Sequence, residues 1–599
     1  MPALPSRSRL LLLGVLFAVT TAWTWAAWGH VRVDFGGALH RAERIADGGV
    51  LYRDIQVHYP PLAPYTMGGL LALFGKHLDV VYTTGLLLLL VESWLLWQVA
   101  RRFLDENDTT IGLVAFWLLL AFQPGLFNWI VPNVFAATFA SLFATAVVAV
   151  LVSDSQRPSA LKLAGAGILI AATGLSKFEY GLAAAATTIV YTCAIRPAER
   201  TGRLAQCMER LTALLTVGLP ATGLAAVTFG LLLLTVPLEV MIDDNLYRER
   251  SLTSALASYK ETLFAPLLPE VGKAALCYLL LFPLLAIMAR PGLRWLRGNP
   301  VEKAGGLFLL LIPITGAYLA SRFVSPDETR NLYKQLQFSW TPTAWLVVAL
   351  GAAMLRERLA NAAAWRTLAI VGVFSFAVAL RWDFFVAWPA YYAVFAPFLV
   401  VLLSRTMLNR FVQGDLETGP ALALVFITWI ATGAAEHAAD YRKHDFALSY
   451  PRGTIWTTRQ NGRPMRQTIN FLRMNAPPGT PIAVIPEEQL INFLAETPHP
   501  TRDTGVGPGW LATREDERRF LEEIRTAGTP FVVLSNRRYT EFQTGGLDSY
   551  EPDVVGALYR SYVPAANTRF YRILERRDRA LAREQEEVAA SGAKGAGHP

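Results

Sequence analysis

Residues 31–65 read VRVDFGGALHRAERIADGGVLYRDIQVHYPPLAPY, and they form the longest polar interruption among the early apolar segments of the chain. Connections between packed helices are usually short, so a loop of about 35 residues with its own helical pattern is typical of a functional loop. The sequence therefore predicts that this loop carries function rather than merely joining two helices.

The first half of the loop has the pattern of an amphipathic helix, residues 35–47. Apolar and polar side chains occupy opposite faces there at helical spacing, which predicts a short interfacial helix. Gly48 and Gly49 follow, and glycine readily takes the left-handed conformation that ends helices. Asp34 has two interpretations: a carboxylate placed where the first membrane segment meets the outside, or the N-cap of this helix. The apolar positions are Phe35, Ala38, Leu39, Ala42, Ile45 and Ala46, and the polar ones are His40, Arg41, Glu43, Arg44 and Asp47.

The composition places the chain among polytopic membrane proteins. Of its 599 residues, 53% are hydrophobic and only 17% are charged, and apolar stretches long enough to span a bilayer recur along it. The first stretch, residues 10–28, has no small-residue cleavage site after it, so we expect an uncleaved membrane helix. The net charge of +8 needs no nucleic acid partner, because much of the surplus lies in loops between apolar segments. Neither a disulfide framework nor a cysteine metal site is suggested by Cys193, Cys207 and Cys277.

The loops between apolar segments predict the orientation. Those that follow even-numbered segments each carry at least two basic residues, and Lys and Arg mark the cytoplasmic side. The N-terminus is therefore expected in the cytoplasm, and everything after about Ala435 outside. The twenty-residue rule gives about thirteen membrane spans, near residues 9–29, 78–99, 110–123, 131–152, 160–176, 180–195, 211–236, 272–289, 304–323, 339–355, 366–380, 384–403 and 418–435.

The chain divides into three parts by composition. Residues 1–436 are expected to form the transmembrane domain, with a first outer loop at residues 30–77. Residues 437–575 alternate short apolar strands with helices, which predicts a small extracytoplasmic α/β domain. Residues 576–599 form a charged tail, helical at its start and disordered at its end. Strands are expected at residues 481–485, 530–534 and 569–574, and helices at 463–476, 487–495, 515–527 and 554–562.

Two polar turns between apolar segments carry further candidates. Lys177 and Glu179 lie at a membrane boundary, either as an isolated ion pair or facing a substrate. Arg381 and Asp383 lie at a second such turn. Arginine offers a planar fork of donors suited to phosphate and lysine offers a point charge, whereas the alternative is snorkelling of both towards lipid headgroups. Glu92, inside an apolar segment, is either a further candidate or a satisfied helix contact.

The order of motifs around the first outer loop resembles a known class of enzyme. Asp34 and the amphipathic helix are followed by Gly49-Val50-Leu51-Tyr52-Arg53-Asp54 and by His58-Tyr59-Pro60-Pro61-Leu62. This order is similar to that of the GT-C glycosyltransferases that use polyprenyl-phosphate sugars, a group that includes bacterial protein mannosyltransferases, aminoarabinose transferases and Rgt-like enzymes. The resemblance covers the membrane half in layout, and its sharp motifs are confined to residues 31–75.

The resemblance implies an enzyme in the bacterial cytoplasmic (inner) membrane that builds the cell envelope. It would move a sugar from a polyprenyl-phosphate donor to an acceptor outside the membrane: a glycolipid, lipopolysaccharide, another polysaccharide or a protein. Asp34 matches the acidic residue of loop one, which in relatives acts as the catalytic base or helps to orient the acceptor or a metal; a carboxylate can accept the proton of an attacking hydroxyl or amine. Lys177 and Arg381 would bind the donor phosphate, and direct displacement would invert the anomeric centre. Supporting or substrate-binding positions are Tyr52, Arg53, Asp54, His58, Tyr59, Glu179 and Asp383.

A metal ion is left open by the same resemblance. Several relatives carry another acidic residue in the second outer loop, whereas residues 123–133 here contain none. A divalent metal held by two carboxylates from those loops is therefore doubtful. Asp54, Glu179 or Asp383 would have to substitute, or the enzyme works without a metal.

Two other classes of protein share parts of this pattern. A transporter or lipid flippase would also have many spans and buried charges, although no internal repeat with paired broken helices is present in the sequence. A non-catalytic polysaccharide-assembly component would bind partners through residues 441–599. The enzyme requires Asp34 for sugar transfer, the flippase moves lipid without forming a glycosidic bond, and the assembly component tolerates the loss of Asp34.

Overall fold

The structure is a computed structural model. It describes residues 6–125, 128–132, 134–153, 158–196, 201–247, 282–323, 362–384, 393–412, 418–511, 513–539 and 545–595. Most of the membrane half and of the C-terminal part is thus described. The predicted span at residues 339–355 and part of those at 272–289 and 384–403 lie outside the described residues, as do Cys277 and most of residues 239–270.

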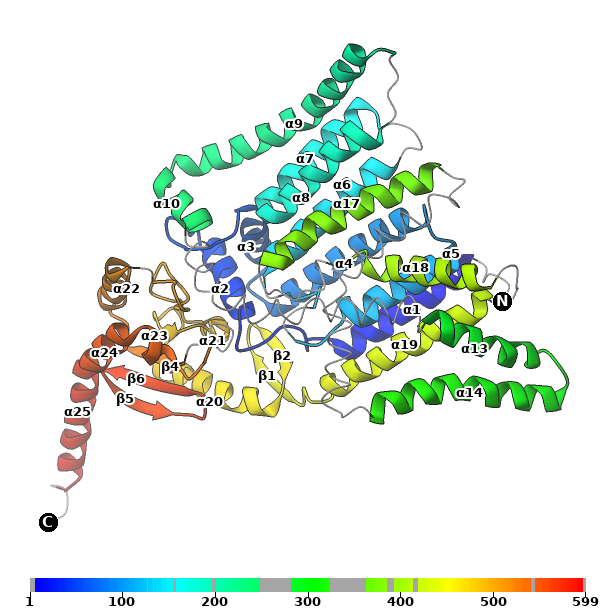
Figure 1. The fold of residues 1–599 in the computed structure, drawn as a ribbon. Helices are drawn as coiled ribbons and strands as arrows, with labels where there is room; N and C mark the ends of the chain where they lie inside the picture. The colour runs from blue at the N-terminus through cyan, green and yellow to red at the C-terminus, as the bar shows by residue number, and fades with distance from the viewer. Residues whose placement is uncertain are drawn as a thin grey trace.

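Long apolar helices make up the membrane half, and they lie side by side in Figure 1. Within the described ranges, five of them are long and apolar enough to cross a membrane: Leu78–Ala100, Phe135–Ser153, Phe178–Ile195, Arg203–Leu233 and Gly419–Tyr441. The total of thirteen spans stays a prediction. The elements of this half are α1 (Ser6–Thr24), α4 (Leu78–Ala100), α5 (Glu106–Ala115), η1 (Phe116–Ala121), α6 (Phe135–Ser153), α7 (Ala160–Ser176), α8 (Phe178–Val190), η2 (Tyr191–Ile195), α9 (Arg203–Leu233), α10 (Leu238–Ile242), η3 (Asp243–Tyr247), α13 (Phe282–Trp295), α14 (Pro300–Phe323), α17 (Ala362–Phe384), α18 (Ala396–Phe411) and α19 (Thr418–Tyr441).

The first outer loop contains the predicted helix and a second one. Helix α2 (Phe35–Ala46) ends where glycine was expected to end it, with Gly48 at a φ of 90°. Residues expected to be loop form the short apolar helix α3 (Leu62–Phe74), which begins directly after the prolines. Proline is well suited to such a place, since its fixed φ is compatible with a first helical turn. The loop therefore contains two packed helices, whereas the sequence predicted only one.

The C-terminal part combines a hairpin, a four-stranded sheet and several helices. Strands β1 (Phe446–Tyr450) and β2 (Gly453–Thr457) pair antiparallel. The larger sheet has the order β3-β4-β6-β5, in which only β3 and β4 are parallel. Its strands are β3 (Ala483–Ile485), β4 (Phe531–Ser535), β5 (Tyr562–Asn567) and β6 (Tyr571–Arg576), and the helices are α20 (Arg459–Asn475), α21 (Leu490–Ala495), α22 (Arg514–Thr526), α23 (Leu547–Tyr550), α24 (Pro552–Ser561) and α25 (Arg577–Gly595).

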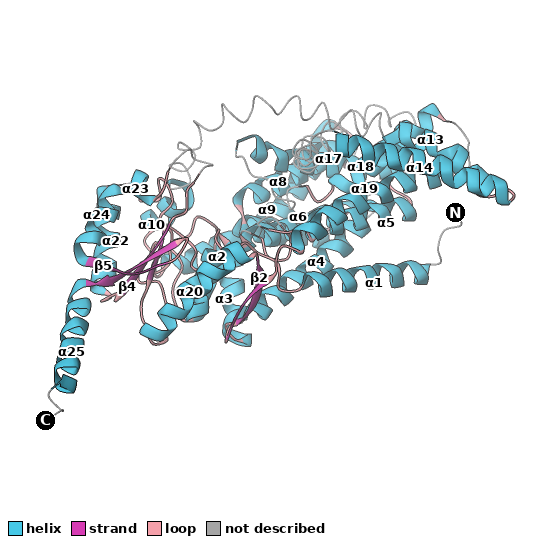
Figure 2. Ribbon diagram, turned by 90° about the horizontal axis from the view of Figure 1, so that it is seen from below, coloured by secondary structure: helices cyan, strands magenta, loops and turns pink. Residues whose placement is uncertain are grey.

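Helix α2 lies between the membrane helices and the C-terminal part in both views (Figures 1 and 2). One continuous core runs through all three, because Phe35 and Leu39 of α2 belong to the same buried cluster as Leu490 and Phe493 of α21. A separate core lies on the other face of the sheet, between the sheet and α22 and α24, and includes Val532. The first outer loop is therefore fixed from two sides.

One predicted turn is helical. Residues 381–383 were expected to form a tight turn between two apolar runs, whereas they belong to the last turn of α17, which continues to Phe384. The apolar pattern on either side of Arg381 and Asp383 fits a longer helix as well as two short ones, so spacing alone did not separate these possibilities.

Candidate active site

Asp34 stands at the first turn of α2 without capping it by its side chain. The backbone carbonyl of Asp34 accepts from the Ala38 amide at 2.9 Å, but no side-chain cap hydrogen bond is formed. The residue has a φ of 31°, on the positive side that L-residues rarely adopt. Local strain of this kind gathers at functional sites. Of the two interpretations of Asp34, side-chain N-capping is the one that the structure does not favour.

Arg41 is the cation that faces Asp34. Its guanidinium folds back over Gly37: a Cβ built on this glycine would lie 3.6 Å from the Arg41 Nη2 atom. Burial lowers the pKa of Arg41, while the charges of Tyr59, Asp34 and Glu487 act in the opposite direction. A buried guanidinium needs such partners because an uncompensated charge is costly away from water. Arg41 is therefore influenced by Glu487 of the C-terminal part as well as by two residues of its own loop.

Lys177 and Glu179 approach the same place from the α7–α8 turn. The Lys177 Nζ atom lies 2.8 Å from the Glu179 Oε1 atom, and the side chains are only 9% and 16% exposed. The Lys177 ammonium also lies 5.8 Å from the centroid of the Tyr59 ring, within reach of a cation–π interaction. The structure thus brings together Tyr59, Lys177 and Glu179, three of the residues predicted from the sequence.

The C-terminal part closes this cluster with two buried ion pairs. The Arg537 Nε atom lies 2.5 Å from the Glu487 Oε1 atom, and the Arg32 Nε atom lies 2.8 Å from the Glu488 Oε1 atom. Burial raises the pKa of Glu487 well above its usual range, and the negative charge of Asp34 adds to this effect. The pKa of Glu488 is also raised by burial, with Arg32 opposing the shift.

The polar face of α2 is covered by protein, which corrects the expectation of an interfacial helix. His40 is fully buried; its Nδ1 atom lies 2.9 Å from Glu43, and its Nε2 atom accepts from the His499 amide at 3.1 Å. Burial lowers the pKa of His40. The Glu43 carboxylate also binds Arg452, and Arg44 donates to the Thr501 carbonyl at 2.6 Å. The pattern was amphipathic because one face meets apolar helices and the other a polar protein surface.

Four predicted residues of the loop support its shape instead of joining the cluster. Tyr52 is buried, and its hydroxyl donates to the Tyr59 carbonyl at 2.8 Å. Asp54 accepts from the Val50 amide at 2.8 Å and pairs with Arg53 at 2.7 Å. The hydrogen bond from Arg53 lowers the pKa of Asp54. These contacts close the turn that positions Tyr59. His58, the fourth residue, packs its ring edge-on to Trp510, with ring centroids 5.3 Å apart.

Two further candidates lie inside helices. Glu92 is fully buried in α4; its Oε1 atom accepts from the Thr145 hydroxyl at 2.8 Å, whereas its Oε2 atom has no hydrogen-bond partner among the described residues. The backbone of Arg381 and Asp383 belongs to α17, and their side chains are outside the described part of the structure. Arg381 and Asp383 therefore remain predictions as site residues.

No group of three or more His, Cys, Asp or Glu side chains that could hold a metal ion occurs within the residues that the structure describes. A divalent metal therefore stays a possibility drawn from the sequence resemblance.

Arg41, Glu487 and Arg537 were missed as site residues by sequence reasoning. Glu487 was included in the helix expected at residues 487–495, where acidic residues at a helix start are ordinary, so nothing marked it as a site residue. Arg41 was seen as a residue of the polar face of α2, and the spacing gave no reason to separate it from Arg44. The influence that distinguishes Arg41 comes from Glu487, more than 400 positions away in the sequence.

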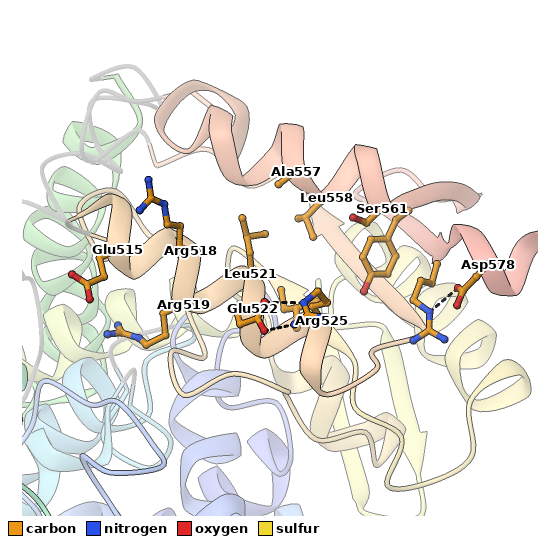
Figure 3. Close-up of a pocket in the computed structure, with 13 residues that line it drawn as sticks. Glu515, Arg518, Arg519, Leu521, Glu522, Arg525, Ala557, Leu558, Ser561 and Asp578 are labelled. Atoms are coloured by element: carbon orange, nitrogen blue, oxygen red, sulfur yellow. Dashed lines mark hydrogen bonds and ion pairs between the residues drawn. The ribbon is translucent and has the colours of Figure 1, made fainter.

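The C-terminal part also contains a groove. A groove of about 870 Å³ runs between α22 and α24 on the C-terminal part (Figure 3), and none of the residues around Asp34 line it. Its rim carries the pairs Glu522–Arg525 and Arg576–Asp578.

A family of known enzymes matches part of the chain. Residues 58–222 match the model of a family described as dolichyl-phosphate-mannose-protein mannosyltransferase. The chain resembles these glycosyltransferases. The match begins at His58 and includes Lys177 and Glu179, and it confirms the resemblance to GT-C enzymes inferred from the sequence. Asp34 lies before the matched residues.

Solved structures of glycosyltransferases are also similar to the chain. ArnT from Cupriavidus metallidurans bound to undecaprenyl phosphate is 15% identical, over 95% of this chain and 98% of that one, with a TM-score of 0.41. The oligosaccharyltransferase of Archaeoglobus fulgidus, in complex with Zn and sulfate, is 11% identical over 92% of this chain and 71% of that one, with a TM-score of 0.45. TM-scores below 0.5 do not by themselves establish a common fold. A search of curated proteins found no significant match.

Proposed function

We propose that the protein is a membrane glycosyltransferase that moves a sugar from a polyprenyl-phosphate donor to an acceptor on the outer side of the membrane. The observation that carries the proposal is the buried Lys177–Glu179 pair beside Tyr59 of the first outer loop, the loop whose helix begins after Asp34. The family match over residues 58–222 supports it, because that family is described by a mannose donor linked through phosphate to a polyprenol, dolichol.

The proposed chemistry divides between a carboxylate and a cation. Asp34 accepts the proton of the acceptor hydroxyl or amine as its oxygen or nitrogen bonds to the anomeric carbon. The bond between that carbon and the phosphate oxygen breaks, and the polyprenyl phosphate leaves with the bonding electrons. Lys177 stabilises the charge that develops on the leaving phosphate, and Arg381 is the second candidate for this role. A single displacement of this kind inverts the anomeric centre.

The proposed arrangement in the membrane follows from the positive loops. The N-terminus lies in the cytoplasm, residues 1–436 form the transmembrane domain, and residues 437–575 form the extracytoplasmic α/β domain with the charged tail 576–599 after it. In a bacterium this places the Asp34 cluster on the outer face of the inner membrane, where glycolipid, polysaccharide and protein acceptors are present.

Donor turnover by the purified full chain in lipid tests the proposal. The assay uses a panel of polyprenyl-phosphate sugars that includes polyprenyl-phosphate mannose, with a membrane-lipid extract as acceptor. We expect transfer by the native chain, and a loss of about 10²- to 10⁴-fold in Asp34→Asn, the range for removing a general base. Asp47→Asn is the matched control, because Asp47 is a carboxylate at the opposite end of α2 that pairs with Lys76 in solvent.

Three results would contradict the proposal. Full transfer by Asp34→Asn would remove Asp34 from the chemistry. Movement of donor lipid across the bilayer without a new glycosidic bond would favour a flippase. Absence of both activities with every donor, in a folded protein that captures partners through residues 441–599, would favour an assembly component.

A further inference from the structure

We propose that Arg502 is a positioning residue of the proposed donor site, and that it acts by holding the turn at Tyr52 in the first outer loop. The inference rests on the proposed function, and it gives the C-terminal part of the chain a role in the reaction. It is carried by a continuous series of contacts that runs from this arginine through Tyr52 and Tyr59 to Lys177.

The guanidinium of Arg502 joins the first outer loop to the segment that follows α10. Its Nε and Nη2 atoms donate to the Tyr52 backbone carbonyl at 3.0 and 2.8 Å. The Nη2 atom also pairs with the Asp244 carboxylate of η3, and the two side chains are only 15% and 0% exposed. Arginine presents its donors in a rigid planar fork, so one side chain can hold both acceptors in a fixed geometry.

The backbone at Tyr52 requires support from its surroundings. Its φ is 67°, on the positive side that L side chains rarely adopt, and such a conformation persists only where neighbouring contacts hold it. The Tyr52 amide donates to the Ile55 carbonyl of the same turn at 2.8 Å, whereas the Tyr52 carbonyl accepts from Arg502. The loop itself therefore holds one backbone group of Tyr52, and the C-terminal part holds the other.

The side chain of Tyr52 connects this turn to the proposed donor site. Its hydroxyl donates to the Tyr59 carbonyl at 2.8 Å, and its ring is fully buried. Buried side chains are closely packed, so a shift of the Tyr52 backbone moves the hydroxyl as well. The Tyr59 ring lies 5.8 Å from the Lys177 ammonium, the cation proposed to stabilise the leaving phosphate. A displacement of about 1 Å at a reacting centre costs about 10²-fold in rate.

The backbone of Arg502 is itself fixed from two sides. Its amide donates to the Glu523 carboxylate of α22 at 2.8 Å, and its carbonyl accepts from the Gln56 amide of the first outer loop at 3.1 Å. The guanidinium therefore starts from a backbone that is already held against the loop.

Arg473 provides an internal comparison. It pairs with the Glu496 carboxylate at 2.7 Å and donates to the Leu494 backbone carbonyl at 3.3 Å, which is the same combination of partners that Arg502 has. Both partners of Arg473 lie in the C-terminal part. An arginine that only stabilises this part should behave like Arg473.

The experiment measures kcat and the donor KM of transfer for the full chain in lipid. The test variant combines Arg502→Gln with Asp244→Asn, because removing both charges leaves no buried carboxylate without its cation. We expect kcat to fall about 10²-fold, and the donor KM to change less than about threefold, since positioning acts on the transition state. Arg473→Gln combined with Glu496→Gln is the matched control and should keep the native kcat and KM.

Two further variants keep the inference testable. Arg502→Lys serves if the test variant does not fold: it retains a cation for Asp244 but lacks the planar fork, so kcat should still fall. Tyr52→Phe removes the next contact in the series, and adding it to the test variant should cost no further rate, because residues that act through one another are not additive. Additive losses would overturn the proposal, as would a fall in kcat matched by an equal fall in the folded fraction.

Amide hydrogen exchange gives a readout that does not depend on turnover. Exchange at residues 50–59 should become faster in the test variant and stay native in the control, because the turn loses its outer support. Native exchange there in the test variant would show that Arg502 does not hold the turn, and the inference would be wrong. Native kcat in a variant with faster exchange would overturn the positioning role alone. Failure of the native chain itself to transfer sugar would overturn the proposed function and, with it, the positioning role.

Discussion

Carboxyl groups paired with arginines occur in two regions: the groove between α22 and α24, and the junction where the start of α2 meets the C-terminal part. The pKa values of the carboxyl groups shift in opposite directions in the two regions. In the groove, hydrogen bonds from Arg525 and Arg576 lower the pKa of Glu522 and of Asp578. At the junction, burial raises the pKa of Glu487 although Arg537 lies 2.5 Å away. Water solvates the groove pairs, whose side chains are 38–75% exposed, and is largely excluded from the junction.

The difference shows why the groove is the weaker candidate for chemistry. Exposed ion pairs are screened and cost little to form or break, so they neither perturb reactivity nor require a function to explain them. Buried carboxyls that repel each other are costly, and perturbed groups of this kind concentrate at functional sites. The two regions differ in how far their ion pairs are shielded from water.

The largest effect among these comparisons concerns two ion pairs of the membrane half, of which Lys177–Glu179 is enclosed and Arg53–Asp54 is exposed. Lys177→Met should reduce transfer by about 10²- to 10³-fold, as expected when a group that stabilises transition-state charge is removed. Arg53→Met, which breaks the exposed Arg53–Asp54 pair, should leave the rate within about twofold, because such pairs contribute little. Transfer assays on both variants provide the comparison.

A control is needed because Lys177→Met leaves Glu179 without its cation. The double variant Lys177→Met with Glu179→Gln removes both charges and should fold with a near-native thermal midpoint. If this double variant regains the native transfer rate, Lys177 is only a structural partner of Glu179 and has no role at the donor phosphate.

A smaller effect is expected from filling the contact between α2 and the C-terminal part. Gly36→Ala places a methyl group against the Leu490 backbone, which cannot yield as a flexible side chain would, so we expect a loss of about 1–3 kcal/mol in stability. Thermal unfolding in lipid measures it. Gly69→Ala in α3 is the matched control, since no atom lies within 4 Å of its Cβ position. It should be neutral or stabilising by up to about 1 kcal/mol, because alanine favours helix more than glycine does.

A Gly36→Ala variant as stable as the native chain would mean that α2 and the segment from Glu487 to Leu490 are less tightly packed than described here. The comparison between an enclosed junction and an open groove would then lose its basis.

Local features of the fold were predictable from the sequence because they depend on nearby residues. Periodicity predicted the helix that begins at Phe35, and Gly48 predicted where it ends. An apolar run predicted the strand that contains Val484. The prediction of a turn around Arg381 was wrong, because an apolar pattern with one polar interruption fits a continuous helix equally well. Polar residues facing protein instead of water were also missed, as His40 shows, since periodicity identifies two faces but not what covers each.

The candidate site was predictable only in its membrane half. Asp34 and Lys177 stand out because ionisable residues beside apolar segments are costly and demand an explanation. Glu487 and Arg537 lie in a part of the chain where charged residues are common, so nothing in their surroundings marks them. Their meaning comes from a long-range contact, and a single sequence contains no record of which distant segments meet.

The smallest expected effect is in the groove. It tests whether an exposed ion pair there contributes to transfer or to stability. Arg525→Gln removes the cation of the exposed Glu522–Arg525 pair on the rim (Figure 3). Transfer and the thermal midpoint should both stay at the native values, because the Glu522 carboxylate left behind remains solvated. The same substitution at the junction, Arg537→Gln, is the comparison, and it should lower the thermal midpoint because it leaves the buried Glu487 carboxylate without its cation. A fall in transfer for Arg525→Gln that appears with a glycolipid acceptor extract but not in donor hydrolysis would place acceptor binding in the groove, and exposure would then be a poor guide to function in this protein.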